Sequence, residues 1–284
     1  MPTTSNRITK PLKRGGVRRA SRNKPNQQPS PTLQTKLQAL SPQQKAKPRP
    51  RPPQEQPLIE RTNNLPLDEF INLYVAQEDL SITAKAQLEP QQEKQEQKQT
   101  YALDLYTAAS LPARVFEQCF ALIEETSATA YRASSIGWSP PKKRSEMRLP
   151  DMKYLVLRRA SSGGEGGADS GPEADAEADV LGFLSFMVTY EDGFEVVYCY
   201  EVHLAAAMQR QGLGAQLMRV FLRIGERVGM QKAMLTVFRA NGAAIRFYER
   251  LGFRVDESSP RPRRLRNGTV KDPDYRILSR VYDQ

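Results

Sequence analysis

A strand that leads through a glycine-containing turn into an amphipathic helix constrains the fold of this chain more than any other feature. Residues 194–204 (FEVVYCYEVHL) form an apolar, β-rich run, and the pattern that follows predicts a helix over residues 212–228. The core-facing stripe of that helix consists of Leu213, Leu217, Val220, Phe221, Ile224 and Val228. Gly212 and Gly214 leave the first backbone N–H groups accessible, and the helix dipole favours an anion there. With Arg210 as an added cation, the turn predicts an anion cradle, and pyrophosphate is the expected ligand.

The remaining pattern predicts a mixed set of helices and strands around this unit. Helices are expected at residues 66–76, 111–131 and 243–250, and strands at 81–88, 101–106, 154–157, 180–190, 233–238 and 275–282. The tripeptide Glu191-Asp192-Gly193 is typical of a hairpin, and Gly252 suits the left-handed position after a helix. Antiparallel strands come first and a β-α-β-α-β run follows. This order predicts an α/β domain with a central mixed, mostly antiparallel sheet flanked by helices.

The positive charge of the chain is concentrated at its N-terminus. Residues 1–61 contain 14 Lys/Arg and two Glu, a balance of +12, whereas the remaining residues contain 28 Lys/Arg and 30 Asp/Glu, a balance of −2. Residues 1–64 are rich in Pro, Arg and Gln and lack apolar periodicity, so they predict a disordered basic tail. The tail could direct nuclear import, contact nucleic acid or a ribosome, or simply be solvated. The expected localisation is the nucleus and cytoplasm. Residues 91–99 and 161–179 are of low complexity and predict surface loops within a domain at 65–284.

Several protein classes are disfavoured by composition. The chain contains no run of 18 apolar residues, so no transmembrane helix is expected. The first residues, MPTTSNR, lack the apolar segment of a secretory signal. Two cysteines, Cys119 and Cys199, cannot staple a scaffold, and with one histidine they argue against a structural zinc site. A reduced intracellular protein without a metal is the expectation.

Motifs in the second half of the chain resemble those of the GCN5-related N-acetyltransferases (GNAT). The sequence Q-x-x-G-x-G at residues 209–214 resembles the acetyl-CoA signature of that family. Downstream, Asn241, Ala244, Tyr248 and the tripeptide Leu251-Gly252-Phe253 resemble the second half of the fold. The resemblance covers about residues 66–284. It implies a GNAT fold, with acetyl-CoA as co-substrate and no metal.

A narrower resemblance is to the NatD-type N-alpha-acetyltransferases. It rests on YCYEV at 198–202, MLTVF at 234–238, SSP at 258–260, Y-x-I-L-S at 275–279, GW at 137–138 and KKRSEM at 142–147. That family acetylates the N-terminal amine of histone 4 and histone 2A, whose exposed sequence is Ser-Gly-Arg-Gly. The resemblance therefore implies these peptides as partners and direct transfer within a ternary complex. The chain departs from the family at Thr189, where an aspartate is usual, and at Ile136, where a second tryptophan is usual.

The resemblance also assigns a cofactor site. Its residues are Val202, His203, Leu204, Arg210, Gln211, Gly212, Leu213, Gly214, Ala215 and Asn241. The first three are expected to pair with pantetheine through their backbone, residues 210–215 to surround the pyrophosphate, and Asn241 to lie near the far arm. For His203 we favour the interpretation of a partly exposed strand residue whose backbone alone matters.

Glu201, Tyr200 and Tyr248 are the candidate catalytic residues. Glu201 is the expected general base, because a carboxylate on a mostly apolar strand is costly to bury unless it serves a role. The alternative is that simple alternation turns it to solvent, and proton removal could also run through water and tyrosine hydroxyls. Tyr248 resembles the tyrosine that protonates the leaving thiolate in the wider family, or else is a core aromatic residue. Cys199 is expected to face away from Glu201, so no activated cysteine nucleophile is predicted.

Tyrosine hydroxyls and carboxylates suit a pocket for a basic peptide N-terminus. The residues nominated by the resemblance are Tyr131, Thr189, Tyr190, Glu191, Tyr200, Thr236 and Tyr275. For Tyr190 and Glu191 the alternative is an ordinary hairpin turn. Two other functions stay open: a lysine or general N-terminal acetyltransferase, and a ribosome- or chromatin-binding module with a degenerate cofactor site.

Overall fold

The computed structural model describes residues 56–85, 98–160, 179–264 and 266–283. The helices are α1 (Leu58–Asn63), α2 (Leu67–Tyr74), α3 (Ala113–Arg132), α4 (Pro140–Met147), α5 (Leu213–Val228) and α6 (Gly242–Arg250), with short 3₁₀ helices at Gln77–Leu80 and Ala206–Met208. The strands are β1 (Ser81–Lys85), β2 (Lys98–Thr107), β3 (Lys153–Arg159), β4 (Gly182–Glu191), β5 (Phe194–Leu204), β6 (Lys232–Phe238), β7 (Arg254–Val255), β8 (Arg263–Arg264), β9 (Val270–Lys271) and β10 (Tyr275–Val281). Most of the predicted tail and of the two predicted loops lies outside the described residues.

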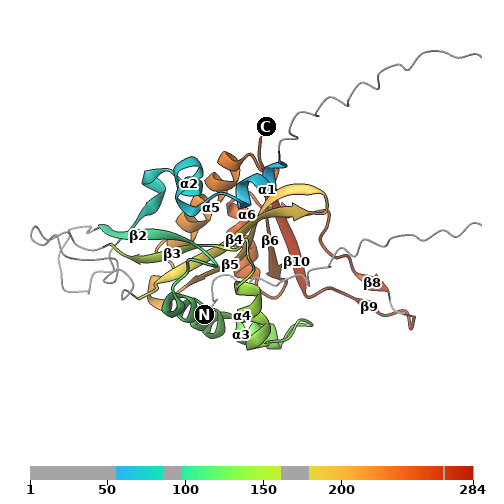
Figure 1. Cartoon of the computed structure of the whole chain (residues 1–284). Helices are drawn as coiled ribbons and strands as arrows, with labels where there is room; N and C mark the ends of the chain where they lie inside the picture. Colours follow the sequence, from blue (N-terminus) through green and yellow to red (C-terminus); the bar gives the residue numbers. More distant parts are fainter. Residues whose placement is uncertain (1–55, 86–97, 161–178, 265, 284) are drawn as a thin grey trace, which may run out of the picture. The chain divides into compact units, whose positions relative to one another are not determined.

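One large sheet organises the domain. Its strand order is β1-β2-β3-β4-β5-β6-β10-β7 (Figure 1). All neighbours pair antiparallel except β5 and β6, which pair parallel. The predicted mixed, mostly antiparallel sheet is therefore confirmed. Strands β8 and β9 form a separate two-stranded ribbon.

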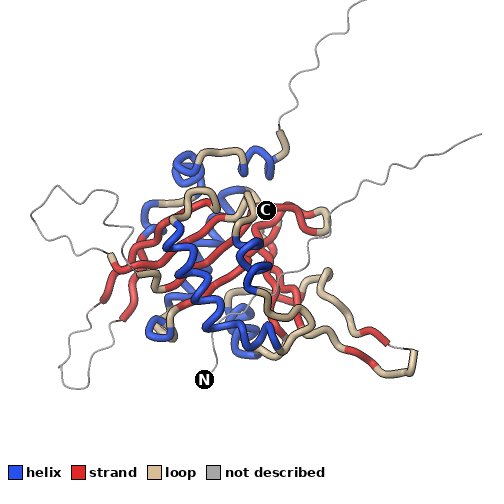
Figure 2. Tube along the Cα trace, turned by 60° about the horizontal axis from the view of Figure 1, so that its bottom comes forward, coloured by secondary structure: helices blue, strands red, loops and turns tan. Residues whose placement is uncertain are grey.

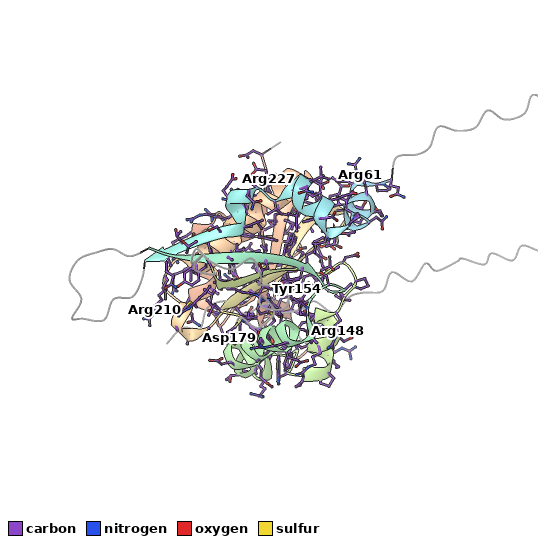
Figure 3. The ribbon with its side chains drawn as sticks, turned by 60° about the vertical axis from the view of Figure 1, so that its left-hand side comes forward. Arg61, Arg148, Tyr154, Asp179, Arg210 and Arg227 are labelled. Carbon is purple, nitrogen blue, oxygen red and sulfur yellow. The ribbon has the colours of Figure 1, made fainter. Side chains whose placement is uncertain are left out.

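Helices cover both faces of this sheet (Figure 2). On one face, α2, α5 and α6 share a core cluster that includes Phe70, Leu217 and Tyr248. On the other face, α3 and α4 bury Phe120 and Met147 against β3 and β4. Figure 3 shows Tyr154 of β3 within the domain. Among the described residues, none of the helices combines the length and apolar character that crossing a membrane would need.

Glycines fix both ends of α5 and its distance from the sheet. Gly212 (φ +81°) precedes the helix and Gly229 (φ +88°) follows it, both in the left-handed conformation that glycine adopts without strain. Within the helix, a Cβ on Gly225 would clash with the Tyr282 hydroxyl and would lie 2.5 Å from Val197 Cγ1. Glycine at this position thus lets α5 pack closely against β5.

The main differences from the sequence prediction are two helices and the start of one strand, and the short strands β7, β8 and β9 were also not predicted. Helix α1 lies within the predicted tail and buries Ile59 and Thr62, so the folded domain begins before residue 65. Strand β2 begins at Lys98, inside the predicted 91–99 loop. Helix α4 was not predicted, because its sequence PPKKRSEM has no apolar periodicity. Prolines at its first turn start it, and Met147 anchors its end in the core.

A β-bulge in β5 decides which side chains share a face. Ser185 pairs with Glu201 and Phe186 with Cys199, so Tyr200 is the extra residue of the bulge. Cys199 consequently joins the α5 side of the core, whereas Glu201 contacts α4 on the other side. The expectation that Cys199 faces away from Glu201 is confirmed. The bulge is the reason, because residues two apart in a regular strand share one face.

Candidate functional site

Strands β5 and β6 separate at the centre of the sheet. Their ladder joins Val196–Cys199 to Lys232–Leu235 and ends there, although β5 continues to Leu204 and β6 to Phe238. Beyond Cys199, the β6-facing edge of β5 pairs with no other strand in the described part of the chain. Such an edge offers backbone donors and acceptors to an extended ligand.

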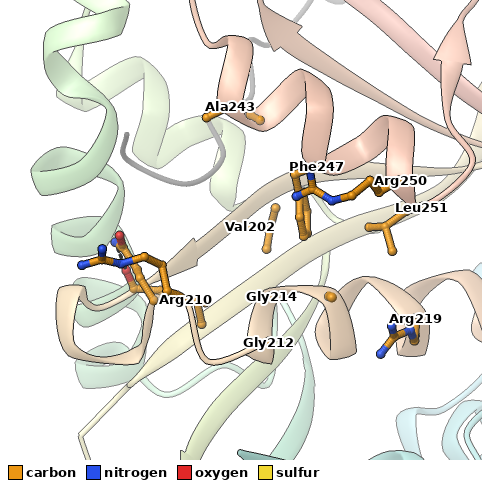
Figure 4. A pocket seen from close by; sticks show the side chains of 13 residues that line it. Val202, Arg210, Gly212, Gly214, Arg219, Ala243, Phe247, Arg250 and Leu251 are labelled. Atoms are coloured by element: carbon orange, nitrogen blue, oxygen red, sulfur yellow. Dashed lines mark hydrogen bonds between the residues drawn. The ribbon is translucent and has the colours of Figure 1, made fainter. Parts of the chain in front are cut away.

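A cavity of about 520 Å³ lies beside this free edge, between β5, α5 and α6 (Figure 4). Its lining residues are Val202, Leu204, Gln209, Arg210, Gly212, Gly214, Ala215, Arg219, Ala243, Ala244, Phe247, Arg250 and Leu251. Aliphatic and aromatic side chains form the walls, and the guanidiniums of Arg210, Arg219 and Arg250 are exposed around it. Within the described ranges, none of these three guanidiniums forms an ion pair or hydrogen bond. The cavity therefore combines an apolar interior with cations free to bind an anion.

The predicted anion cradle lies at one end of this cavity. Arg210 (φ +62°) and Gly212 (φ +81°) both have positive φ, which turns the chain sharply into α5. Residues Gly212, Gly214 and Ala215 line the cavity as predicted. A Cβ on Gly214 would lie 3.5 Å from Leu204 Cδ1, an ordinary van der Waals contact, so this position has room for a small side chain.

Two side chains of the cradle point elsewhere. The Gln211 amide donates to the carbonyl of Ala207 at 2.6 Å, and Leu213 is buried in the core. Only the backbone of these two residues remains available for a ligand. At the start of α6, the Asn241 side chain accepts a hydrogen bond from the Ala244 N–H at 3.0 Å and caps the helix.

Glu201 lies at the centre of a buried polar network on the α3–α4 side of the sheet. Its Oε1 accepts hydrogen bonds from Lys143 Nζ at 2.8 Å and from the Tyr131 hydroxyl at 3.2 Å. Its Oε2 lies 2.7 Å from His203 Nε2. The side chain is 1% exposed, so the alternative in which alternation turns it to solvent is wrong.

Burial and the paired cation act in opposite directions on the pKa of Glu201. Burial alone raises the pKa of a carboxyl group, but Lys143 and His203 more than offset this effect, and the pKa of Glu201 falls to about 2. Burial lowers the pKa of Lys143, but Glu201, Tyr131 and Glu146 together outweigh burial and raise it above its usual value. A carboxylate with so low a pKa holds a proton weakly, which disfavours long-lived protonation of Glu201 during proton transfer.

His203 differs from its predicted environment. We expected a partly exposed strand residue, but the side chain is fully buried. Its Nδ1 lies 2.6 Å from the Thr126 hydroxyl, which itself donates to the carbonyl of Leu122 at 2.6 Å. The bulge explains the difference, because it turns both Glu201 and His203 under α3. His203 therefore connects α3 to the carboxylate through its side chain.

Lys143 is the main residue of the network that sequence reasoning missed. It lies on the unpredicted helix α4, is 5% exposed and also donates to the Tyr131 hydroxyl at 2.9 Å. Burial is the main cause that raises the pKa of Tyr131 above its usual value. The only signal in the sequence was the KKRSEM motif, which carried no role for a particular lysine.

The predicted peptide-binding residues divide into two groups. The first group contains four residues. Tyr131 contacts Glu201. The other three, Tyr200 of β5, Thr236 of β6 and Tyr275 of β10, surround the buried Tyr198. The Thr236 side chain is buried, and its hydroxyl lies 2.6 Å from the Tyr198 hydroxyl. Tyr200 and Tyr275 are partly exposed.

The second group lies at the far end of the β4–β5 hairpin. Thr189 is four residues beyond Ser185, the partner of Glu201, which is about 13 Å along a strand. Glu191 is partly exposed at the turn, and the exposed Tyr190 hydroxyl donates to Glu60 Oε2 at 3.2 Å. These residues are thus separated from the Glu201 network along the β4–β5 hairpin, and Tyr190 contacts α1 on the other face of the sheet.

Tyr248 is buried on α6 between the rings of Phe247 and Phe253, at centroid distances of 5.2 and 5.9 Å. This environment agrees with the interpretation as a core aromatic residue. Its predicted catalytic role stays a prediction.

The sequence profile of the Acetyltransferase (GNAT) family matches residues 134–253. These residues include the separation of β5 and β6, the cavity and Glu201. This part of the chain is similar to the GNAT family. The sheet and its flanking helices have the GNAT fold, as the resemblance predicted.

Curated relatives share only part of the chain. N-alpha-acetyltransferase 40 of Saccharomyces cerevisiae is 31% identical over 169 residues, which cover 52% of this chain and 55% of the relative. Mycothiol acetyltransferase of Streptomyces avermitilis is 38% identical over 85 residues, which cover 30% of this chain and 27% of the relative. The chain thus spans about half of the length of the first relative and about a quarter of the length of the second. A solved GCN5-related N-acetyltransferase from Kribbella flavida is 19% identical, with a TM-score of 0.43, and the match covers 63% of this chain and 98% of that one.

Proposed function

We propose that this protein transfers the acetyl group of acetyl-CoA to the N-terminal amine of proteins, with the Ser-Gly-Arg-Gly termini of histone 4 and histone 2A as substrates. The observation that carries the proposal is the free edge of β5 beside a cavity lined by arginines, within the residues that match the GNAT family. The likeness to an N-alpha-acetyltransferase supports an N-terminal amine as acceptor. The histone preference rests on the NatD-type motifs.

The residues of the cavity fit acetyl-CoA. The β5 backbone at Val202 and Leu204 would pair with the pantetheine amides, and the apolar walls would hold its methylene groups. Arg210 and the first amides of α5, near Gly212 and Gly214, would hold the pyrophosphate. Acetyl-CoA supplies an activated acetyl thioester.

The opposite sheet face holds the groups that would act on the amine. In the transfer, the amine nitrogen bonds to the acetyl carbon, the carbon–sulfur bond breaks, the amine loses a proton and the thiolate gains one. We propose that Glu201 draws the amine proton through the Tyr131 and Tyr200 hydroxyls or an intervening water. Its low pKa fits brief passage of the proton to solvent rather than storage.

The experiment compares transfer of labelled acetyl from acetyl-CoA to a lysine-containing peptide that begins with Ser-Gly-Arg-Gly with transfer to the same peptide blocked at its N-terminus. We expect label on the free peptide only. Equal label on both would assign the activity to lysine side chains, and label on neither would refute the proposed substrate. Binding of CoA, measured by calorimetry, separates loss of cofactor binding from a wrong peptide.

The proposed localisation is the nucleus and cytoplasm, supported by the basic composition of residues 1–61. Because α1 is packed on the domain, the appropriate truncation removes residues 1–55 and keeps Ile59 in place. We expect the truncated protein to lose nuclear enrichment and to acetylate the peptide at an unchanged rate. A fluorescent fusion reports the first result and the peptide assay reports the second.

A further inference from the structure

A basic β-ribbon follows β7 and forms no part of the main sheet. Strands β8 and β9 pair antiparallel across a turn that contains Gly268 (φ +84°). The ribbon projects from the domain on the side of β10 (Figures 1 and 2). Residues 261–271 contain five basic residues and no acidic one. The rest of residues 62–284 contain 23 basic and 30 acidic residues, so the ribbon is a cationic element on an acidic domain.

The arginines of the ribbon are free to bind a partner. They are Arg261, Arg263, Arg264 and Arg266, and all are exposed. In the described part of the chain, none of their guanidinium groups forms a hydrogen bond or an ion pair. The nearby carboxylates are engaged elsewhere: Asp272 lies 3.4 Å from Arg239, and Asp274 accepts a hydrogen bond from the Ser135 hydroxyl at 3.1 Å. These two carboxylates therefore have partners other than the four ribbon arginines.

We propose that the β8–β9 ribbon binds the phosphodiester backbone of a double-stranded nucleic acid. Guanidinium groups match phosphate oxygens in a bidentate geometry, and a two-stranded ribbon is narrow enough for the major groove of B-form DNA. An acidic protein surface is a weaker fit, since protein interfaces need apolar anchors. The described ribbon residues offer only Val270. An isolated two-stranded ribbon is marginally stable in water, so a bound partner would also order it.

The base of the ribbon is attached beside the candidate peptide site. The Arg239 N–H donates to the carbonyl of Asp274 at 2.9 Å, and Tyr275, a predicted peptide contact, begins β10. Nucleic acid bound to the ribbon would therefore hold the domain with its candidate peptide site toward proteins that are bound to the same nucleic acid. That consequence rests on the proposed function, whereas binding by the ribbon does not.

The test measures binding of the full chain to a labelled 20-base-pair DNA duplex, and to an RNA duplex, across a range of KCl concentrations. The ribbon variant replaces Arg261, Arg263, Arg264 and Arg266 with Gln. The matched control replaces four exposed basic residues elsewhere, namely Arg61, Arg132, Lys142 and Arg159, with Gln. Each lost phosphate contact lowers the salt slope of log K on DNA by about 0.9. We expect the ribbon variant to lower that slope by about 3 to 4 and the control variant by less than about 1.

Equal slopes for the two variants would overturn the proposal, because binding would then depend on total charge or on the N-terminal residues. A ribbon variant that loses binding to polyglutamate but keeps binding to both duplexes would also overturn it, in favour of an acidic protein partner. If the ribbon variant loses binding to only one of the two duplexes, the result supports the proposal and identifies that duplex, DNA or RNA, as the ligand. Peptide acetylation by the same variants should be unchanged. If the wild-type protein does not acetylate the peptide at all, the binding comparison still tests the ribbon, because it does not depend on the proposed function.

Discussion

Replacement of Lys143 by methionine should destabilise the domain far more than replacement of any exposed lysine. The ammonium is buried and lies 2.8 Å from Glu201, and the carboxylate is itself 1% exposed. Removing one partner of a buried ion pair leaves the other charge uncompensated and costs about 3–5 kcal/mol. The pKa of Glu201, about 2 against an ordinary 4.5, gives an independent figure. At about 1.4 kcal/mol per pKa unit, that shift corresponds to roughly 3 kcal/mol.

The assay is thermal unfolding of the full chain followed by circular dichroism. For a domain of this size, 1 kcal/mol corresponds to about 2–4 °C in Tm, so Lys143→Met should lower Tm by roughly 6–20 °C. Lys142→Met is the matched control, because Lys142 is adjacent and exposed. The double variant Lys143→Met/Glu201→Leu should recover much of the loss, because it removes both buried charges.

Acid pH should reduce the difference between wild type and Lys143→Met. The folded-state pKa of Glu201 lies below its unfolded value, so the ion pair stabilises the protein above about pH 4.5. This contribution is lost as the pH falls from about 4.5 through about 2. A Tm for Lys143→Met within about 2 °C of the Lys142→Met value at pH 7 would refute the argument, because a pair worth so little behaves as an exposed one.

Three further predictions concern other residues. Glu201→Gln should lower turnover far more than CoA affinity, and an unchanged rate at saturating substrate would remove Glu201 from the mechanism. Gly212→Ala should cost about 1 kcal/mol of stability and weaken CoA binding in calorimetry. Gly268→Ala, at a similar φ in the ribbon, is its control and should leave CoA binding unchanged. Burial lowers the pKa of Lys153 from its ordinary 10.5 to about 8. The charged ammonium therefore destabilises the folded protein below about pH 8, and the free energy of unfolding rises as the pH increases from about 8 to 10.5. Lys153→Met should therefore stabilise the protein at pH 7 by up to about 3 kcal/mol, a gain that urea titrations should show disappearing by pH 10.5.

Local patterns predicted the sheet and the cavity wall well. The strand at 194–204, the stripe of α5 and the left-handed conformation of Gly252 all follow from periodicity and from the conformational freedom of glycine. Each of these signals arises within a few neighbouring residues. Gly212 and Gly214 line the cavity as expected for the same reason.

The Glu201 network could not be derived from such patterns. Lys143 lies on a charged helix without periodicity, 58 residues away along the chain from the carboxylate that holds it. The bulge at Tyr200 leaves no mark in a sequence that reads as an uninterrupted strand, although it determines where Glu201 and His203 point. Pairing of buried charges depends on contacts between distant segments, so sequence pattern alone assigned His203 an exposed position.

The separation of β5 and β6 has a kinetic consequence for the proposed enzyme. The cavity opens on the α5–α6 side of the sheet, while Glu201 and the candidate peptide residue Tyr131 belong to the α3–α4 side. The two products would therefore leave through different exits, and release of one need not await the other. CoA should compete with acetyl-CoA for the enzyme but not with the peptide, so accumulated CoA would slow the reaction even at saturating peptide.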